Sequence, residues 1–249
     1  MYDYYLGGLT SFAADRAAAE RVLAHMPYQR RSAEENRRFL GRAVEFLAGP
    51  QCGVDQFLDI GMGLPTTRSV HEMARAVNPA ARVAYVDNDP LVVSHGKAML
   101  TESGCSVVAE GDLRDPVALL GDPDIRAHLD LSRPVGLLLV NVMHWVADSA
   151  GPRHVLSVLR DALAPGSYLV LTHASMDLVS DKDAANRAAR VYEHSNARLH
   201  PRGRTQVVRL FDGWKLLDPG LVPKHQWRPG PEEGPAPFDG SWAGVAVKT

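Results

Sequence analysis

The stretch QFLDIGMG, residues 56–63, carries the strongest indication of the fold in this 249-residue chain. Its apolar first half has the length of a buried strand, and Gly61 and Gly63 follow where the chain must turn. The apolar residues after Gly63 recur at helical intervals, so we expect a helix that begins at Pro65 and ends before Asn78. A strand, a glycine loop and a helix in this order form the first half of a βαβ unit.

Further short apolar runs follow this unit, and helical patterns separate them. The five expected strands cover residues 56–60, 82–86, 105–109, 135–142 and 167–172. One of the intervening helices is expected at 153–163, because Pro165 and Gly166 end its pattern. Alternating strands and helices predict an α/β fold with a Rossmann-like, doubly wound and mostly parallel sheet.

Helical segments precede the first strand. Residues 11–25 show an alanine-rich helical pattern. A second helix is expected to start at Ser32, because Glu35 lies three residues later, the spacing of a capping box, and its pattern stops near Gly49. We therefore expect residues 1–50 to form an N-terminal helical cap.

The chain after residue 174 combines a polar helix with two apolar segments. The helix is expected at 181–199, and the apolar segments lie at 214–222 and 242–247. Residues 229–237, PGPEEGPAP, contain too many breakers for regular structure. We expect two late strands joined by this excursion, which gives a seven-stranded sheet with an antiparallel C-terminal edge strand.

The composition argues against several classes of protein. Hydrophobic residues make up 45% and charged residues 22% of the chain, as in ordinary globular domains. A net charge of −2 provides no overall attraction for nucleic acid. The longest apolar run, 134–146, is too short to span a bilayer, and the start MYDYYLGG has no signal-peptide pattern, so we expect a cytoplasmic protein without membrane segments. Cys52 and Cys105 lack CxxC spacing and are expected to be buried thiols.

The glycine loop lies where doubly wound sheets bind ligands, because strand ends and a helix N-terminus meet there. An acidic residue, Asp87, follows the next expected strand. A carboxylate in that position can accept hydrogen bonds from both hydroxyls of an adenosine ribose. The alternatives are an ordinary turn acid at Asp87 and a simple tight turn at Gly61 and Gly63.

The charge of the loop distinguishes between two nucleotide cofactors. Asp59 would repel the pyrophosphate of NAD but attract the ammonium group of S-adenosylmethionine (SAM). The helix N-terminus expected near Thr66 and Thr67 would favour the carboxylate of SAM. Thr66 also stands where the GxGxxG pattern of dinucleotide-binding folds has its third glycine. Both features favour SAM, with an NAD-dependent oxidoreductase as the alternative.

Several sequence blocks are shared with one protein family. They are YDYYLGG, FAADR, FLDIGMGLPT, ARVAYVDNDP, GDLRDP, LAPGSYLVLTH and FDGWKLLDPGLV. With them the chain resembles class I methyltransferases and, more narrowly, a mainly actinobacterial family of SAM-dependent methyltransferases formerly classed as a domain of unknown function. The resemblance implies that Asp112 bonds the adenine amino group, that Leu113 packs on the ring, and that Asn141 and Val142 border the methionine part. The expected cofactor-binding residues are Asp59, Gly61, Gly63, Asp87, Asn88, Asp112, Leu113, Asn141 and Val142.

Methyl transfer requires an aligned acceptor, and a base only when the acceptor must lose a proton. His144 and His173 follow the fourth and fifth expected strands, where an acceptor would approach the cofactor, and are the catalytic candidates. A hydrogen-bonded structural role is the alternative for each. Tyr192 and His194 are more remote candidates. The acceptor is expected to be a small molecule, and no metal site is expected because the histidines lack ligand spacing.

We expect one domain, residues 1–249, because no repeat or linker divides the chain. After the cap, residues 51–174 form the cofactor-binding core, and residues 175–249 supply the substrate-side helices and the last strands. The tyrosines near the N-terminus can form a lid, a core contact or a contact in a homo-oligomer. A sensor or scaffold that binds SAM without turnover is the alternative function.

Overall fold

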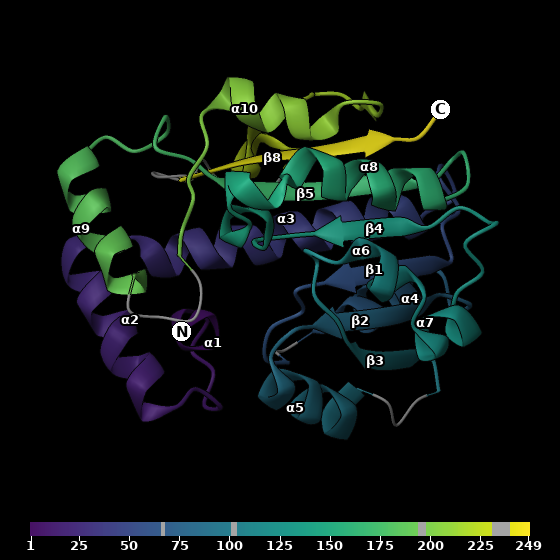
Figure 1. The fold of residues 1–249 in the computed structure, drawn as a ribbon, viewed down its shortest axis with the longest axis horizontal. Helices are drawn as coiled ribbons and strands as arrows, with labels where there is room; N and C mark the ends of the chain where they lie inside the picture. The colour runs from purple at the N-terminus through teal and green to yellow at the C-terminus, as the bar shows by residue number, and fades with distance from the viewer. Residues whose placement is uncertain (66–67, 101–103, 194–197, 231–239) are drawn as a thin grey trace.

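The computed structural model describes residues 1–65, 68–100, 104–193, 198–230 and 240–249. Figure 1 shows one central sheet with helices on both faces, and helices α1, α2 and α9 gathered beyond one end of the sheet. The strands are β1 (Gln56–Ile60), β2 (Arg82–Asp87), β3 (Ser106–Glu110), β4 (Gly136–Leu139), β5 (Tyr168–Ala174), β6 (Lys215–Leu216), β7 (Val222–Pro223) and β8 (Ser241–Val247). The α-helices are α1 (Tyr2–Tyr5), α2 (Ala13–His25), α3 (Gln29–Ala48), α4 (Val70–Val77), α5 (Pro90–Leu100), α6 (Pro116–Leu120), α7 (Pro123–His128), α8 (Pro152–Ala162), α9 (Lys182–Tyr192) and α10 (Arg204–Val208).

The strand order along the sheet is β3-β2-β1-β4-β5-β8-β6, and β7 also pairs with β8. The pairs among β1 to β5 are all parallel, whereas β8 runs antiparallel to its neighbours. The direction in which successive strands are added reverses between β1 and β4: β2 and β3 lie on one side of β1, and β4 and β5 lie on the other. Such a switch point opens a crevice at the carboxyl ends of the strands, where ligands of this fold bind.

A hydrophobic core covers each face of the sheet. Within β1, Leu58 and Ile60 belong to the core shared with α6, α7 and α8, whereas Phe57 packs in the core shared with α3, α4 and α5. This separation follows from the two-residue repeat of a strand, which directs successive side chains to opposite faces. The predicted doubly wound, mostly parallel architecture is confirmed.

The C-terminal part of the sheet differs in detail from the prediction. The apolar segment 214–222 does not form one strand, because Pro219 and Gly220 interrupt it. Two short strands, β6 and β7, pair with β8 in its place. The described residues therefore form a sheet of eight strands rather than seven. β8 itself is antiparallel as predicted, and it pairs with β5 from Tyr168 to Ala174. Residues 231–237, most of the predicted excursion 229–237, lie outside the described residues.

The helix after β1 begins later than predicted. Its first residue is Val70 rather than Pro65, because Ser69 and Glu72 form a capping box in which the Ser69 backbone N–H donates to Glu72 Oε2 (2.6 Å). Thr66 and Thr67, which were expected at the helix N-terminus, lie outside the described residues. The predicted end of the helix is confirmed, since Val77 is its last residue.

The capping box predicted at Ser32 is wrong. Helix α3 begins at Gln29, so Ser32 lies inside the helix, where its hydroxyl accepts a hydrogen bond from Lys224 Nζ (2.8 Å). The local pattern predicted that the Ser32 hydroxyl caps the helix, but the hydroxyl instead bonds Lys224, a residue far along the chain. Glu35 is also buried within the helix and pairs with Arg38.

Three further element ends differ from the prediction. β4 stops at Leu139 instead of 142, and β5 continues to Ala174 instead of 172 because all seven of its residues pair with β8. The predicted helix 181–199 is helical from Lys182 to Tyr192. His194 lies outside the described residues.

The N-terminal cap packs against α9 through a separate small core. Tyr5 from α1, Ala19 and Val22 from α2, Ala33 from α3 and Ala188 from α9 form this core. Figure 1 shows the same arrangement, with α2 beside α9 and α3 continuing behind the sheet. In the described part of the chain, no helix is long and apolar enough to cross a membrane.

Candidate active site

The loop after β1 is held close to the neighbouring strands. The backbone N–H groups of Gly61 and Met62 both donate to the carbonyl oxygen of Val86 (2.8 and 3.1 Å). Gly61 has a φ of +79°, and a Cβ placed there would lie only 2.6 Å from Val142 Cγ2. Glycine at position 61 is therefore required both by the backbone conformation and by the close approach of Val142, which follows β4.

Asp59 lies in β1 with its carboxyl group almost fully buried. Burial raises the pKa of this carboxyl to about 7, the guanidinium of Arg37 opposes the increase, and the carboxyl of Asp87 adds to it. The buried carboxyl of Asp59 is difficult to ionise on its own, and a cation bound next to it would stabilise its charged carboxylate form. The local electrostatics therefore suit an ammonium group.

Asp87, the last residue of β2, faces the glycine loop. The Gly63 backbone N–H donates to Asp87 Oδ2 (2.9 Å), and the Asp89 backbone N–H donates to Oδ1 (3.0 Å). Burial raises the pKa of Asp87, and the hydrogen bond from Gly63 partly opposes this. Because a carboxylate offers about four lone-pair sites, each oxygen can still accept a hydroxyl from a ligand.

Asp112 follows β3 at the same edge of the sheet. Arg114 Nε lies 2.9 and 3.0 Å from the two carboxylate oxygens, and these hydrogen bonds lower the pKa of Asp112. The next residue, Leu113, is buried in the adjoining core. The pair thus presents a fixed carboxylate beside an apolar surface, which fits an adenine amino group and ring.

These side chains line one large cavity, which has a volume of about 590 Å³. Cofactor sites generally occupy roughly 300 to 1,000 Å³. All nine predicted cofactor-binding residues line this larger cavity: Asp59, Gly61, Gly63, Asp87, Asn88, Asp112, Leu113, Asn141 and Val142. The parallel register brings them together, because β1, β2, β3 and β4 all end at this edge. The residues present therefore fit SAM, with a buried acid for its ammonium group and polar side chains for its nucleoside.

A smaller cavity, of about 160 Å³, adjoins the larger one. Tyr2, Asn36, Asn141 and Trp145 line both cavities and mark the junction between them. The wall of the smaller cavity also includes residues of α2, α3 and α9. The N-terminal cap therefore contributes to the site and does not simply cover the sheet.

A chain of hydrogen bonds orders the junction between the cavities. The Asn141 backbone N–H donates to Thr172 Oγ1 (2.8 Å), and this hydroxyl donates to Asn36 Oδ1 (2.9 Å). Asn36 Nδ2 then donates to the Tyr2 hydroxyl (3.0 Å), which donates to the Ala33 carbonyl (3.1 Å). Sequence patterns assigned no role to Asn36 or to Thr172, although Thr172 lies in the block LAPGSYLVLTH, because their partners lie far away in the chain.

His144 lies directly beside the smaller cavity, in the short 3₁₀ helix Met143–Trp145. Burial holds the pKa of His144 well below its usual value, and the charges of His173, Lys224 and Arg202 lower it further, so the ring is neutral at pH 7. The Ala174 backbone N–H donates to Nδ1 (3.4 Å). In the neutral ring the proton therefore resides on Nε2.

His173 occupies a different environment from the one predicted. It lies within β5 rather than after it, is completely buried, and lines neither of these two cavities. Arg202 Nη1 donates to His173 Nε2 (2.9 Å), and because a guanidinium can only donate, Nδ1 carries the proton and donates to the Ala174 carbonyl (2.8 Å). Both ring nitrogens are occupied, and burial lowers the pKa of His173 to about 4.

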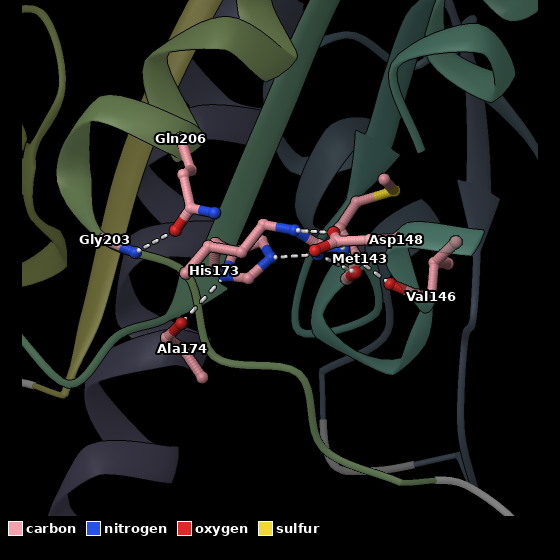
Figure 2. Close-up of polar contacts among 8 residues, drawn as sticks. Met143, Val146, Asp148, His173, Ala174, Gly203 and Gln206 are labelled. Atoms are coloured by element: carbon pink, nitrogen blue, oxygen red, sulfur yellow. Dashed lines mark hydrogen bonds and ion pairs between the residues drawn. The ribbon is translucent and has the colours of Figure 1, made fainter. Parts of the chain in front are cut away.

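The partner of His173, Arg202, joins three segments of the chain. Its guanidinium donates to the carbonyl oxygens of Met143 (3.2 Å) and Val146 (2.7 Å) and to the carboxylate of Asp148 (2.6 Å). Figure 2 shows how these contacts converge beside His173. Arg202 thereby fixes the loop that carries His144, a role that no sequence motif indicated.

Tyr192, the more remote candidate, lines the smaller cavity from α9. Its hydroxyl lies 3.3 Å from the hydroxyl of Tyr5 in α1. This contact connects the N-terminal segment to α9 across the cavity. A part-buried hydroxyl pair of this kind is consistent with the packing role considered for the N-terminal tyrosines.

Solved structures share this fold. Human N-acetylserotonin methyltransferase in complex with SAM matches with a TM-score of 0.53 and 17% identity, over 100% of this chain and 62% of that chain, which shows a common fold. A proposed methyltransferase from Thermobifida fusca YX matches with a TM-score of 0.91 and 40% identity, over 100% of this chain and 93% of that one. A DUF574 family protein from Streptomyces avermitilis MA-4680 matches with a TM-score of 0.94 and 32% identity, over 100% and 95%. No curated protein sequence matches the chain.

The fold and the family model define a SAM-dependent methyltransferase of the Rossmann-like class. More narrowly, the chain belongs to the S-adenosyl methyltransferase family Methyltransf_19, whose model matches residues 1–249. The predicted family, enzyme class and cofactor are confirmed. The NAD-dependent alternative has no support from the family model.

Proposed function

We propose that this enzyme transfers the methyl group of SAM to a small molecule bound in the smaller cavity. The observation that carries the proposal is the shared wall of the two cavities, formed by Tyr2, Asn36, Asn141 and Trp145. A methyl group held at this wall would face an acceptor on the other side. An acceptor as large as a folded protein could not enter a cavity of about 160 Å³ as a whole.

We assign the cofactor contacts by the chemistry of the side chains. Asp59 would bind the ammonium group, Asp87 the ribose hydroxyls, Asp112 with Leu113 the adenine, and Asn141 with Val142 would border the methionine part. The bound cofactor supplies an electrophilic methyl group, whose carbon bonds to an acceptor lone pair while the sulfur–carbon bond breaks and its electron pair stays on sulfur.

The roles of the two histidines differ in this proposal. His144 lines the smaller cavity, and no described residue bonds its Nε2, so its N–H can orient an acceptor by donating a hydrogen bond. Its lowered pKa makes it a weak base. His173 instead positions Arg202 and the Met143–Trp145 segment from within the core.

The cofactor assignment is tested by isothermal titration calorimetry with S-adenosylhomocysteine (SAH). Asp87→Asn removes a charged acceptor and should weaken SAH binding by about 10- to 150-fold, the range expected for a hydrogen bond to a charged group. Asp89→Asn is the matched control, because Asp89 lies two residues away and does not line the larger cavity. Equal losses in both variants would refute the ribose assignment.

The acceptor class is tested with SAM that carries a labelled methyl group and a cell extract separated by mass. Label should appear in the low-mass fraction in the presence of the enzyme, and His144→Ala should slow its appearance without changing SAH affinity. Label recovered in macromolecules would contradict the proposal. Binding of SAH without any transfer would instead support a sensor.

A further inference from the structure

The walls that α2 and α9 give to the smaller cavity are apolar. Helix α2 contributes Val22, and α9 contributes three small residues, Ala185, Ala188 and Ala189. Both helices carry several charged residues, and none of these lines the cavity. Because a charged group is costly to transfer into apolar surroundings, these walls favour an uncharged ligand.

The aromatic part of the wall uses its polar atoms internally. The Tyr2 hydroxyl accepts a hydrogen bond from Asn36 Nδ2 (3.0 Å), and the hydroxyls of Tyr5 and Tyr192 lie 3.3 Å apart. The rings of Trp145 and Tyr192 pack with their centroids 5.3 Å apart. These four aromatic residues line the cavity and offer it mainly ring surface, which packs well against a planar ligand.

The amino groups at the cavity wall have partners within the protein. Lys224 Nζ donates to Ser32 Oγ (2.8 Å), and Lys224 has further contacts. The amino group of Met1 lies 3.5 Å from Asp15 Oδ1. Among the described residues that line the cavity there is no aspartate or glutamate that could balance a cationic ligand. We therefore assign no ionic contact between this cavity and its ligand.

His144 gives the wall a neutral hydrogen-bond donor. Its Nδ1 accepts from the Ala174 backbone N–H, and no described residue bonds the N–H of Nε2. The ring of His144 lies 4.9 Å from that of Trp145, which belongs to the junction between the cavities. A neutral N–H in this position suits an uncharged oxygen of a ligand, such as a carbonyl or a hydroxyl.

The volume of the smaller cavity limits its ligand to about one ring. Its volume of about 160 Å³ is close to the roughly 150 Å³ of an engineered apolar cavity that holds one benzene. One six-membered ring with small substituents therefore fits between the aromatic residues and the alanines of α9.

We propose that the acceptor is an uncharged molecule built on one aromatic ring, which apolar and aromatic contacts hold and whose oxygen accepts the N–H of His144. This inference rests on the proposed function, because it requires that the smaller cavity holds the acceptor. It adds a charge state, a shape and an orienting contact to an acceptor that was otherwise only small.

The first test compares three probes that differ in charge but have nearly the same shape. They are 4-hydroxybenzamide, which is neutral, the anion 4-hydroxybenzoate and the cation of 4-(aminomethyl)phenol. Calorimetry at pH 7 measures their binding to the full chain saturated with SAH. The amide should bind at least about tenfold more tightly than either ion, because only the ions must lose the hydration of a charge in an apolar cavity.

The contact with His144 is tested with His144→Phe, which keeps a ring but removes the N–H. The variant should bind 4-hydroxybenzamide about 3- to 10-fold more weakly, the range expected for one neutral hydrogen bond. Its affinity for toluene, which has no oxygen, should not fall, whereas a merely structural role of His144 would weaken both ligands. His154→Phe is the matched control, because His154 is exposed on α8 and lines neither cavity.

Val179→Lys provides a second variant in case His144→Phe does not fold. Val179 lines the smaller cavity outside any helix or strand, so a lysine there adds an ammonium group to the wall. The preference should shift towards 4-hydroxybenzoate. Val208→Lys, in α10 and away from both cavities, should leave the preference as it is.

Three results would overturn the inference. They are binding of either ion as tightly as the amide by the wild-type protein, no binding of any probe, and an amide affinity and a charge preference that stay unchanged in both wall variants. Failure of SAH binding or labelling of macromolecules would instead contradict the proposed function, so the two failures can be distinguished.

Discussion

Asp59→Asn should make the ligand-free protein more stable at pH 8 while it weakens the binding of SAH. The carboxyl of Asp59 has a pKa of about 7 in the folded protein, against an ordinary value of 3.8. Between these two values the folded state retains a proton that the unfolded chain has released, so stability falls as the pH rises through this window. Above pH 7 the full difference applies, which corresponds to about 4 kcal/mol.

Asparagine has nearly the same shape but cannot ionise, and therefore avoids this cost at pH 8. His144 and His173 produce an opposite trend, because their lowered pKa values cause stability to be lost as the pH falls through about 6.5. The informative quantity is consequently the difference in unfolding free energy between Asp59→Asn and the wild-type protein, in which the contributions of both histidines cancel.

The measurement is urea denaturation of both proteins at pH 4 to 8, with and without SAH. Without ligand, the advantage of Asp59→Asn should increase by up to about 4 kcal/mol between pH 4 and pH 8. With SAH at 100 times its wild-type Kd, the wild-type protein should gain about 2.7 kcal/mol and the variant clearly less. Asp124→Asn, at an exposed position in α7, should show neither effect. A difference that does not depend on pH, or a variant that binds SAH normally, would refute the reasoning about Asp59.

Three further predictions concern the walls of the site. Gly61→Ala should destabilise the protein more than Gly53→Ala does, as measured by thermal unfolding. Both positions have a positive φ, which costs a non-glycine residue about 1 to 3 kcal/mol. Only at position 61 would the added Cβ also lie 2.6 Å from a neighbouring side chain. Thr172→Val should lower the Tm and slow methyl transfer, because the Asn36 carbonyl loses its donor at a cost of about 1 to 3 kcal/mol; an unchanged Tm would argue against the hydrogen-bond chain. Arg202→Met should destabilise by at least about 2 kcal/mol, as two buried carbonyls lose partners, with urea midpoints as the readout; a neutral result would contradict its connecting role.

The residues expected on the cofactor side could be grouped from the sequence, and they line one cavity, because they come from consecutive strand ends. Asp59, Asp87 and Asp112 are each recognisable within a few residues of an apolar run. In a parallel sheet such ends lie at one edge, and the switch between β1 and β4 opens a crevice there. The periodicity of short segments was therefore sufficient to bring these residues together.

The acceptor side could not be predicted in the same way. The smaller cavity combines α1, α3, α9 and the segment at Lys224, which lie far apart in the sequence and have no common motif. Ser32 shows the difficulty clearly: its local pattern indicated a helix cap, but a lysine 192 residues later bonds its hydroxyl inside the helix. His173 was placed beyond a strand end, whereas pairing with β8 extends that strand past it.

Local sequence was thus enough to establish the α/β class, the glycine loop and the identity of the cofactor. These features depend on hydrophobic periodicity and on backbone conformations that neighbouring residues dictate. The extent of β5, the burial of His173, the network around Arg202 and the cavity beside Lys224 were decided by tertiary packing. Such features depend on which distant surfaces exclude water together, and a pattern within one segment contains no information about its distant partner.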